Sequence, residues 1–126
     1  MTPEEYVRAF AQAFGDQNAE AFADLIAKDG TMHSLTGAWA EGLAEVKAAF
    51  AAEAAGIFAR ARLVTGKGSV VALAHDVALL RQRFVVTGAL DEQGAEIPRF
   101  GAMLVAVLKS DGQVWRGLNL SFSLVA

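Results

Sequence analysis

The chain has 126 residues, a net charge of −3 and 54% hydrophobic residues, which suits one domain with a substantial core. It has no cysteine, so disulfides and thiolate chemistry are excluded and a reducing cytoplasm is compatible. No apolar run approaches the roughly 20 residues of a membrane helix, and the overall acidity argues against a nucleic acid partner. We therefore expect a single cytoplasmic domain over residues 1–126 that binds neither membrane nor nucleic acid.

The first half of the chain predicts three helices with one short strand among them. Thr2-Pro3-Glu4-Glu5 combines an N-cap residue, a proline at the first helical position and an acidic residue three positions after the cap. An aromatic stripe at four-residue spacing follows it, formed by Tyr6, Phe10 and Phe14. A second helix is expected from Asn18 until Lys28-Asp29-Gly30, a short strand at residues 31–35 and a third helix at residues 43–57.

The second half predicts an antiparallel meander. Strands are expected at residues 60–65, 70–73, 77–87, 99–109 and 114–124. Gly66-Lys67-Gly68 indicates a bend or bulge, and Ser110-Asp111-Gly112-Gln113 indicates the turn of a long hairpin. The fold class is therefore α+β, with three N-terminal helices packed on one face of a mainly antiparallel sheet.

Charge is divided along the chain. Residues 1–53 hold nine acids and three bases, whereas residues 54–126 hold five acids and eight bases. The arginines of the predicted strands are Arg60, Arg62, Arg81, Arg83, Arg99 and Arg116. This division predicts an acidic helical layer over a basic sheet.

The two longest predicted strands carry apolar residues on both faces. Val105 and Val107, for example, alternate with Leu104 and Leu108. A sheet with one face in water should alternate apolar with polar residues, so both faces are expected to be covered. The helices cover one face and a second copy of the chain is the simplest cover for the other. We predict a homodimer through the sheet face that buries roughly 1,200–2,000 Å² in total.

The order of elements and the residues Trp39-x-Glu41-Gly42 resemble those of the nuclear-transport-factor-2-like superfamily, whose members are cone-shaped, cystatin-like α+β domains. Within it the chain is similar to small SgcJ-like and SnoaL-like proteins, whose helix entry, Gly-x-x-x-Ile/Val, is matched by Gly42–Val46. Trp115-Arg116 matches the Trp-Arg of their last strand, whereas Ser121-Phe122-Ser123 replaces their usual Gln-Asn-Thr. The resemblance implies a strongly curved sheet that forms a cone with an internal pocket.

Enzymes of this superfamily, such as ketosteroid isomerase, need a carboxylate base and a tyrosine-plus-acid oxyanion hole in that pocket. Where the isomerase has its base, this chain has His33 and Ser34, and residues 100–108 contain no carboxylate. No predicted strand in the sheet carries an acid, which disfavours isomerase and aspartate-dependent cyclase chemistry. His33 is the remaining acid/base candidate, although a histidine that is simply hydrogen-bonded in a strand fits the sequence as well. Two histidines without spaced carboxylates or cysteines indicate no metal site, and no cofactor is expected.

The residues expected to contact a ligand are Met32, His33, Trp39, Phe58, Arg81, Arg83, Met103, Trp115 and Asn119. Arg81 and Arg83 share one face of a strand and, with Arg116, suit a clamp for a carboxylate or phosphate. Pairing of these arginines with acids on neighbouring strands is the alternative. Trp115 and Asn119 have the same strand parity, and Trp39 suits either a pocket wall or a plug of the cone.

Three functions follow from these expectations. The first is a non-catalytic homodimer that binds a small, mainly apolar and possibly acidic molecule in the cone. The second is an isomerase, dehydratase or cyclase that uses His33. The third is a dimerisation or protein-docking module, which predicts a filled cone and an exposed apolar groove. The missing carboxylates favour a protein without catalysis.

Overall fold

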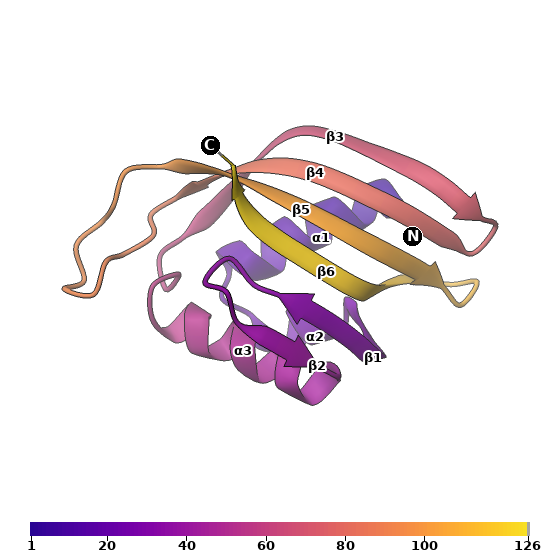
Figure 1. The fold of residues 1–126 in the computed structure, drawn as a ribbon, viewed down its shortest axis with the longest axis horizontal. Helices are drawn as coiled ribbons and strands as arrows, with labels where there is room; N and C mark the ends of the chain where they lie inside the picture. Colours follow the sequence, from indigo (N-terminus) through magenta and orange to yellow (C-terminus); the bar gives the residue numbers. More distant parts are fainter. Residues whose placement is uncertain (126) are drawn as a thin grey trace.

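The computed structural model describes residues 1–125 as three helices and one six-stranded sheet. The helices are α1 (Pro3–Gly15), α2 (Ala19–Ala23) and α3 (Leu43–Ala55). The strands are β1 (Ile26–His33), β2 (Trp39–Glu41), β3 (Arg62–Ala74), β4 (Val77–Thr87), β5 (Phe100–Ser110) and β6 (Trp115–Val125). Their order in the sheet is β2-β1-β6-β5-β4-β3, with β1 parallel to β6 and every other neighbouring pair antiparallel (Figure 1). The predicted fold class is confirmed.

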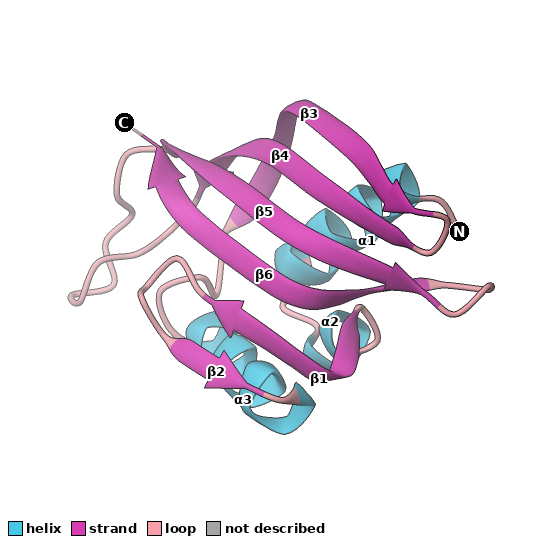
Figure 2. Ribbon diagram, turned by 45° about the vertical axis from the view of Figure 1, so that its right-hand side comes forward, coloured by secondary structure: helices cyan, strands magenta, loops and turns pink. Residues whose placement is uncertain are grey.

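The helices all lie on one side of the sheet, and the sheet curves around them (Figure 2). Helix α1 packs against β3 and β4, on the far side of the sheet in Figure 1, and α3 lies beside β1 and β2. The inward-facing side chains of the sheet and the apolar sides of the helices form one core. The opposite side of the sheet, which we call the outer face, is left open by the helices.

Helix α1 begins as its sequence predicts. The hydroxyl oxygen of Thr2 accepts a hydrogen bond of 3.1 Å from the amide of Glu5, and proline occupies the first turn. Tyr6, Phe10 and Phe14 are buried against the sheet, so the aromatic stripe is the core side of the helix.

The expected second helix is wrong in its length. Helix α2 ends at Ala23, and Ile26 already belongs to β1, which pairs with both β2 and β6. The amide of Gly117 in β6 donates a 2.7 Å hydrogen bond to the carbonyl of Leu25. Pairing with a strand some ninety residues further along the chain overrides the helical spacing of the local apolar residues.

The antiparallel half of the sheet follows the prediction closely. Strand β4 has the predicted bounds, and β5 and β6 form the predicted long hairpin. The two short strands expected on either side of Gly66-Lys67-Gly68 are one strand, β3, whose register shifts between Thr65 and Gly68. The predicted bulge is thereby confirmed.

Candidate functional site

The inside of the cone is filled by aromatic rings. The buried phenylalanine rings come from α1, α2, α3, β4, β6 and the segment after α3, and they are Phe10, Phe14, Phe22, Phe50, Phe58, Phe84 and Phe122. The rings of Phe22 and Phe50 stack with centroids 4.1 Å apart and planes 11° from parallel. The ring centroid of Phe10 lies within 6.0 Å of the centroids of Phe22 in α2, Phe84 in β4 and Phe122 in β6.

The space that remains between these rings is about 20 Å³. Room for one water molecule needs roughly 10–15 Å³, whereas sites for small organic ligands measure about 300–1,000 Å³. A cavity of this size is smaller than a ligand-sized pocket, because phenylalanine rings take up most of the space inside the cone. Met32 and Phe58 are buried as expected, but they are part of this packed core.

One carboxylate lies at the edge of this small cavity. Glu53 of α3 accepts hydrogen bonds from the hydroxyl groups of Ser34, at 2.7 Å, and Thr36, at 2.5 Å. These bonds hold the loop between β1 and β2 against α3. Glu53 is not among the predicted site residues, because those acids were expected in strands, whereas helix α3 brings this one to the cavity.

The expectation that no strand carries an acid is also wrong. Asp29 lies in β1 and Glu41 in β2, because β1 is longer than predicted and the loop around Trp39 forms a strand of its own. Both side chains are exposed, and the Glu41 carboxylate accepts a 3.1 Å hydrogen bond from the indole nitrogen of Trp39. Neither of them supplies an acid to the inside of the cone.

Most of the expected ligand-contacting residues lie on the outer face instead. The strand register places a continuous row of side chains across this face, from β3 to β2: Ser69, Arg81, Val105, Ser121, His33 and Trp39. The rings of His33 and Trp39 lie 6.2 Å apart, and Trp39 is 68% exposed. His33 therefore faces away from Met32, Ser34 and the cone, and no carboxylate within residues 1–125 forms an ion pair with it.

Trp115 and Asn119 do not share a face. Leu108 pairs with Gly117 and Val107 pairs with Asn119, so Leu118 is an extra residue in β6. This bulge reverses the alternation of the strand. Trp115 packs against the core, whereas Asn119 lies on the outer face and donates a 2.7 Å hydrogen bond to the hydroxyl of Thr31.

Two of the three expected clamp arginines remain together. Arg81 and Arg83 both line a hollow of about 200 Å³ on the outer face, with Lys67, Gly68, Ser69 and Met103. Arg116 lies at the hairpin end of β6, where its guanidinium group pairs with Asp111 at 3.0 Å. The expected three-arginine clamp is therefore wrong. In the strand register, Arg81 lies opposite Val105 of β5, whereas Arg116 lies opposite Lys109, four residues further along β5.

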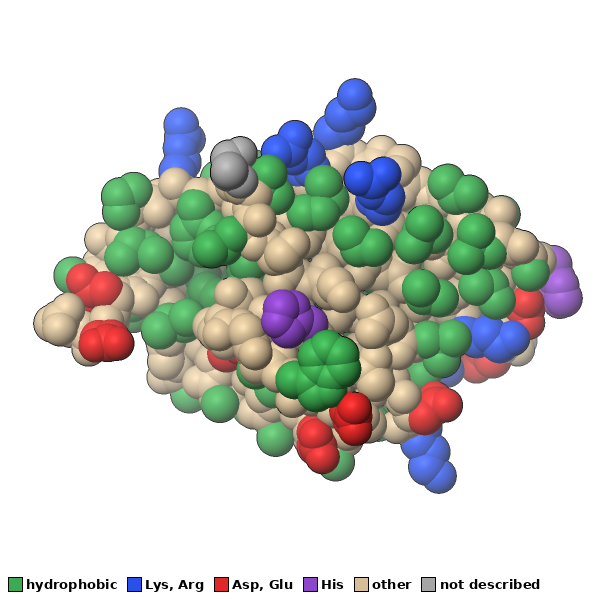
Figure 3. Space-filling model, viewed as in Figure 1, with side chains coloured by type: hydrophobic (Ala, Val, Ile, Leu, Met, Phe, Trp, Pro, Cys, Tyr) green, Lys and Arg blue, Asp and Glu red, His purple; other side chains and the backbone are tan. Residues whose placement is uncertain are grey.

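The outer face is apolar in its middle and charged at its two sides. Basic side chains stand along the edge over β3 and β4, whereas acidic side chains lie near β2 and α3, below the central histidine (Figure 3). Apolar side chains spread between these charged sides. The Val71–Leu79–Val107 row of the register is an apolar stretch of this kind, and Val71 is 51% exposed.

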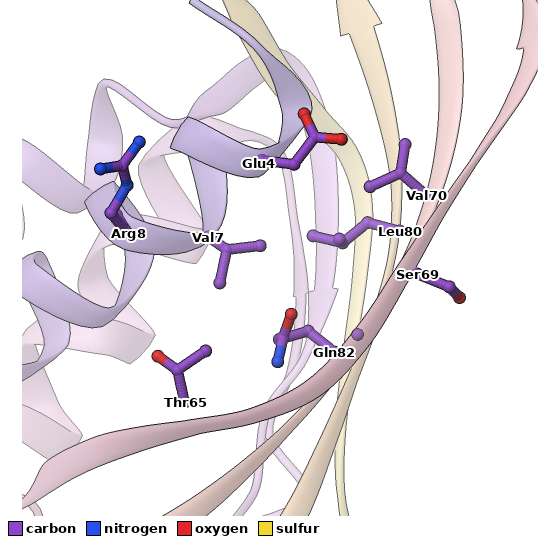
Figure 4. Close-up of a pocket in the computed structure, with 9 residues that line it drawn as sticks. Glu4, Val7, Arg8, Thr65, Ser69, Val70, Leu80 and Gln82 are labelled. Atoms are coloured by element: carbon purple, nitrogen blue, oxygen red, sulfur yellow. The ribbon is translucent and has the colours of Figure 1, made fainter.

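A second hollow, of about 280 Å³, lies between α1 and the inner side of β3 and β4. Glu4, Val7 and Arg8 line it from the helix, and Leu80 and Gln82 point toward it from β4, while Ser69 points to the opposite side of β3 (Figure 4). Glu4 and Arg8 are exposed side chains at the rim of a wide opening. The hollow therefore offers less convergent chemistry than the outer face.

Two broader classes of site have no support in the described residues. Within residues 1–125, no three metal-binding side chains are grouped in a way that suits a metal ion. Of the helices in the same range, none has the length and apolar character needed to cross a membrane.

No family model and no curated protein matches the sequence. Solved structures do resemble the fold. An uncharacterised protein with a cystatin-like fold from Caulobacter vibrioides is 20% identical with a TM-score of 0.87, over 98% of this chain and 87% of that one. A putative calcium/calmodulin-dependent protein kinase II association domain from Xanthomonas campestris is 18% identical with a TM-score of 0.81, over 97% and 84% of the chains.

A third similar structure is an NTF2-like protein of unknown function in nutrient uptake from Rhodospirillum rubrum. It is 15% identical, with a TM-score of 0.77 over the full length of both chains. At these identities the likeness is one of fold, and the narrower resemblance to SgcJ-like and SnoaL-like proteins stays a prediction. The chain has the cystatin-like fold of nuclear-transport-factor-2-like proteins, as the order of its elements and its Trp39-x-Glu41-Gly42 segment predict.

Proposed function

We propose that this protein is a non-catalytic assembly module that forms a homodimer through the outer face of its sheet. The observation that carries the proposal is the contrast between the two sides of the sheet. The inner side is closed by a packed aromatic core, whereas the outer side presents apolar side chains to solvent at Val71 and Val85 and half-buried ones at Leu79, Val105 and Val107. Apolar surface of this extent is commonly covered by a protein partner.

A second copy of the chain suits this face because its charges are self-complementary. A twofold axis that runs along β5 and β6 places the basic side of one copy over the acidic side of the other. Strand β4 of one copy then lies over β1 of its partner, so Arg81 faces His33 with Glu41 on the neighbouring strand β2, and the apolar rows meet in the middle. Opposite charges at the rim would fix the orientation of the two copies.

The size of the face also suits a dimer. Strands β4, β5 and β6 each have 11 residues, which corresponds to a length of about 36 Å at roughly 3.3 Å per residue. Six strands spaced about 4.8 Å apart span about 24 Å, so the footprint is roughly 850 Å². A stable interface of standard size takes about 800 Å² from each partner.

The two other functions considered from the sequence have less support. A ligand held inside the cone would need the phenylalanine core to move apart, because the free space is about 20 Å³. An enzyme that uses His33 would have its acid/base group on the outer face, away from the cavity and from Glu53. Among similar folds, the putative association domain from Xanthomonas campestris is a precedent for an assembly role.

The oligomeric state tests this proposal directly. We expect the native protein to sediment as a dimer at micromolar concentration. Val107→Glu introduces a charge in the middle of the outer face and should shift the protein to a monomer while leaving its circular dichroism spectrum unchanged. Ala48→Glu makes a similar change on an exposed position of α3 and should remain dimeric. A native monomer over the whole micromolar range would refute the homodimer.

The proposed orientation has its own test. Arg81→Glu alone and Glu41→Arg alone should each weaken the dimer, since each places like charges opposite one another. The double variant should recover dimerisation by restoring opposite charges. A double variant that is no more dimeric than the two single variants would contradict this orientation.

A further inference from the structure

The hollow of about 200 Å³ on the outer face concentrates positive charge. Lys67 reaches it from the bulge of β3, and Arg81 and Arg83 reach it from β4. The two arginines are separated by one residue, so their Cα atoms lie roughly 7 Å apart on the same face of the strand. Met103 provides an apolar wall and Ser69 a hydroxyl group.

The three cations have no acidic partner within residues 1–125. The ion pairs of the described chain involve Lys47, Lys109, Arg116 and His75, and all of them lie elsewhere. Like charges on adjacent positions of a sheet repel one another unless an opposite charge compensates them. The hollow therefore carries positive charge that no described acidic side chain neutralises, and a bound anion would neutralise it.

The bulge that places Lys67 beside the two arginines is held in position from the core. Gln82 is 5% exposed, and its side-chain nitrogen donates hydrogen bonds to the carbonyl groups of Gly66 and Arg83, both at 2.9 Å, and approaches that of Lys67 at 3.3 Å. A Cβ atom on Gly68 would lie 2.0 Å from the side-chain oxygen of Gln82, so a larger residue here would have to displace the Gln82 side chain that holds the bulge. Bulges of this kind redirect side chains next to functional sites.

We propose that this hollow is a binding site for the carboxylate or phosphate group of a small molecule. Guanidinium groups recognise such oxyanions through paired N–H donors, and the lysine and the serine hydroxyl add further donors. The volume suits one anionic group with a short apolar extension against Met103, since extended ligands occupy larger sites. All residues of the site come from one copy, and the hollow lies on the face that the proposed dimer covers, so an anion bound there would lie at the edge of the dimer interface.

Titration of ¹⁵N-labelled protein with inorganic phosphate, at ionic strength held constant with NaCl, tests this site. We expect saturable chemical-shift changes that are largest at the amides of Gly68, Ser69 and Met103. The double variant Arg81→Gln, Arg83→Gln should bind phosphate about tenfold more weakly or worse, because two charged donors are lost. Arg99→Gln, an exposed arginine outside the hollow, should bind phosphate as the native protein does.

The same oxyanion chemistry has a second source, the Glu41 carboxylate of a second copy, and the experiment separates the two. Phosphate binding by the native protein supports the proposed small-molecule site, whatever sedimentation of the same sample shows about its oligomeric state. Binding that appears only after Glu41→Gln would identify the carboxylate of the second copy as the native occupant and overturn the proposal. Shifts that do not saturate, or that the double variant retains, would overturn it as well.

Discussion

The hydroxyl group of Tyr6 donates a 2.7 Å hydrogen bond to the carbonyl oxygen of Leu25. The amide of Gly117 donates to the same oxygen, also at 2.7 Å. One carbonyl group thus joins the first helix, the residue before β1 and the last strand of the sheet. Burial raises the pKa of the Tyr6 hydroxyl well above its ordinary value, so this group stays a neutral donor.

Tyr6→Phe should lower the free energy of unfolding by about 0.5–1.5 kcal/mol near neutral pH, because one buried hydrogen bond is lost while the Leu25 carbonyl keeps its bond from Gly117. The pKa of Tyr6 is raised in the folded state, so its contribution is complete below about pH 10 and declines above it, as tyrosine ionises in the unfolded chain. Urea unfolding of the native protein and the Tyr6→Phe variant from pH 7 to pH 11 measures this difference in the free energy of unfolding.

Other ionising groups are common to the native protein and the Tyr6→Phe variant, so the difference between the two isolates Tyr6. We expect this difference in the free energy of unfolding to narrow above about pH 10. A difference that stays constant to pH 11 would show that Tyr6 is not a buried, protonated donor.

The filled cone leads to a second expectation. Phe50 stacks on Phe22 and also lies near Phe14, with ring centroids 6.4 Å apart. Phe50→Ala should lower the free energy of unfolding by about 3–5 kcal/mol, because it removes buried apolar surface and leaves a cavity. Phe50→Leu keeps most of the volume and should cost clearly less.

Binding of xenon or benzene provides an independent readout of that cavity. Phe50→Ala should bind such a probe, since large apolar cavities in proteins stay dry and accept small apolar molecules. The native protein should bind neither, in agreement with about 20 Å³ of free space. Benzene binding by the native protein would mean that the core opens more readily than its packing indicates.

Local sequence signals predicted those parts of the fold that local chemistry decides. The cap at Thr2, the bounds of β4 and the turn at Asp111 depend on residues close together in the chain. The start of β1 does not, because Ile26 is drawn into the sheet by β6. Strand pairing over such a separation leaves no mark in the spacing of the local residues.

The candidate site was harder to predict for two further reasons. Whether a cone is hollow depends on how side chains from separate elements meet, and no single segment shows that Phe10, Phe22 and Phe122 fill the same space. The direction of Trp115 depends on a bulge at Leu118, and the one local signal for it, Gly117 next to Leu118, does not by itself show which residue is the extra one. Arg81 and Arg83 were placed together correctly because a strand of regular alternation connects them.

The contact between Gly68 and Gln82 leads to a third expectation. Gly68→Ala forces the two side chains apart and should lower the free energy of unfolding by about 1–3 kcal/mol. Gly101→Ala in β5 is a matched control, since its Cβ would have only ordinary contacts, the nearest at 3.6 Å. Urea unfolding should show little change for this control, and equal losses in the two variants would contradict the role of Gln82.

The turn between β5 and β6 makes stability depend on pH in the acidic range. One carboxylate oxygen of Asp111 accepts hydrogen bonds of 2.9 Å from the amides of Val114 and Gln113, and the other accepts one of 3.0 Å from Arg116. These contacts, led by the two amides, lower the pKa of Asp111 from 3.8 to about 2. A lowered pKa means that the contribution is present above about pH 3.8 and is lost as pH falls toward 2.

Asp111→Asn keeps an oxygen that can accept from the two amides but removes the charge that pairs with Arg116. The variant should therefore melt below the native protein at pH 6, and the two melting temperatures should converge as pH falls from about 4 to 2. Arg116→Gln should show a smaller deficit at pH 6, since it leaves the two amide bonds to Asp111 intact. Melting temperatures of the native and Asp111→Asn proteins that stay equally far apart from pH 6 to 2 would show that the charge of Asp111 does not stabilise the hairpin.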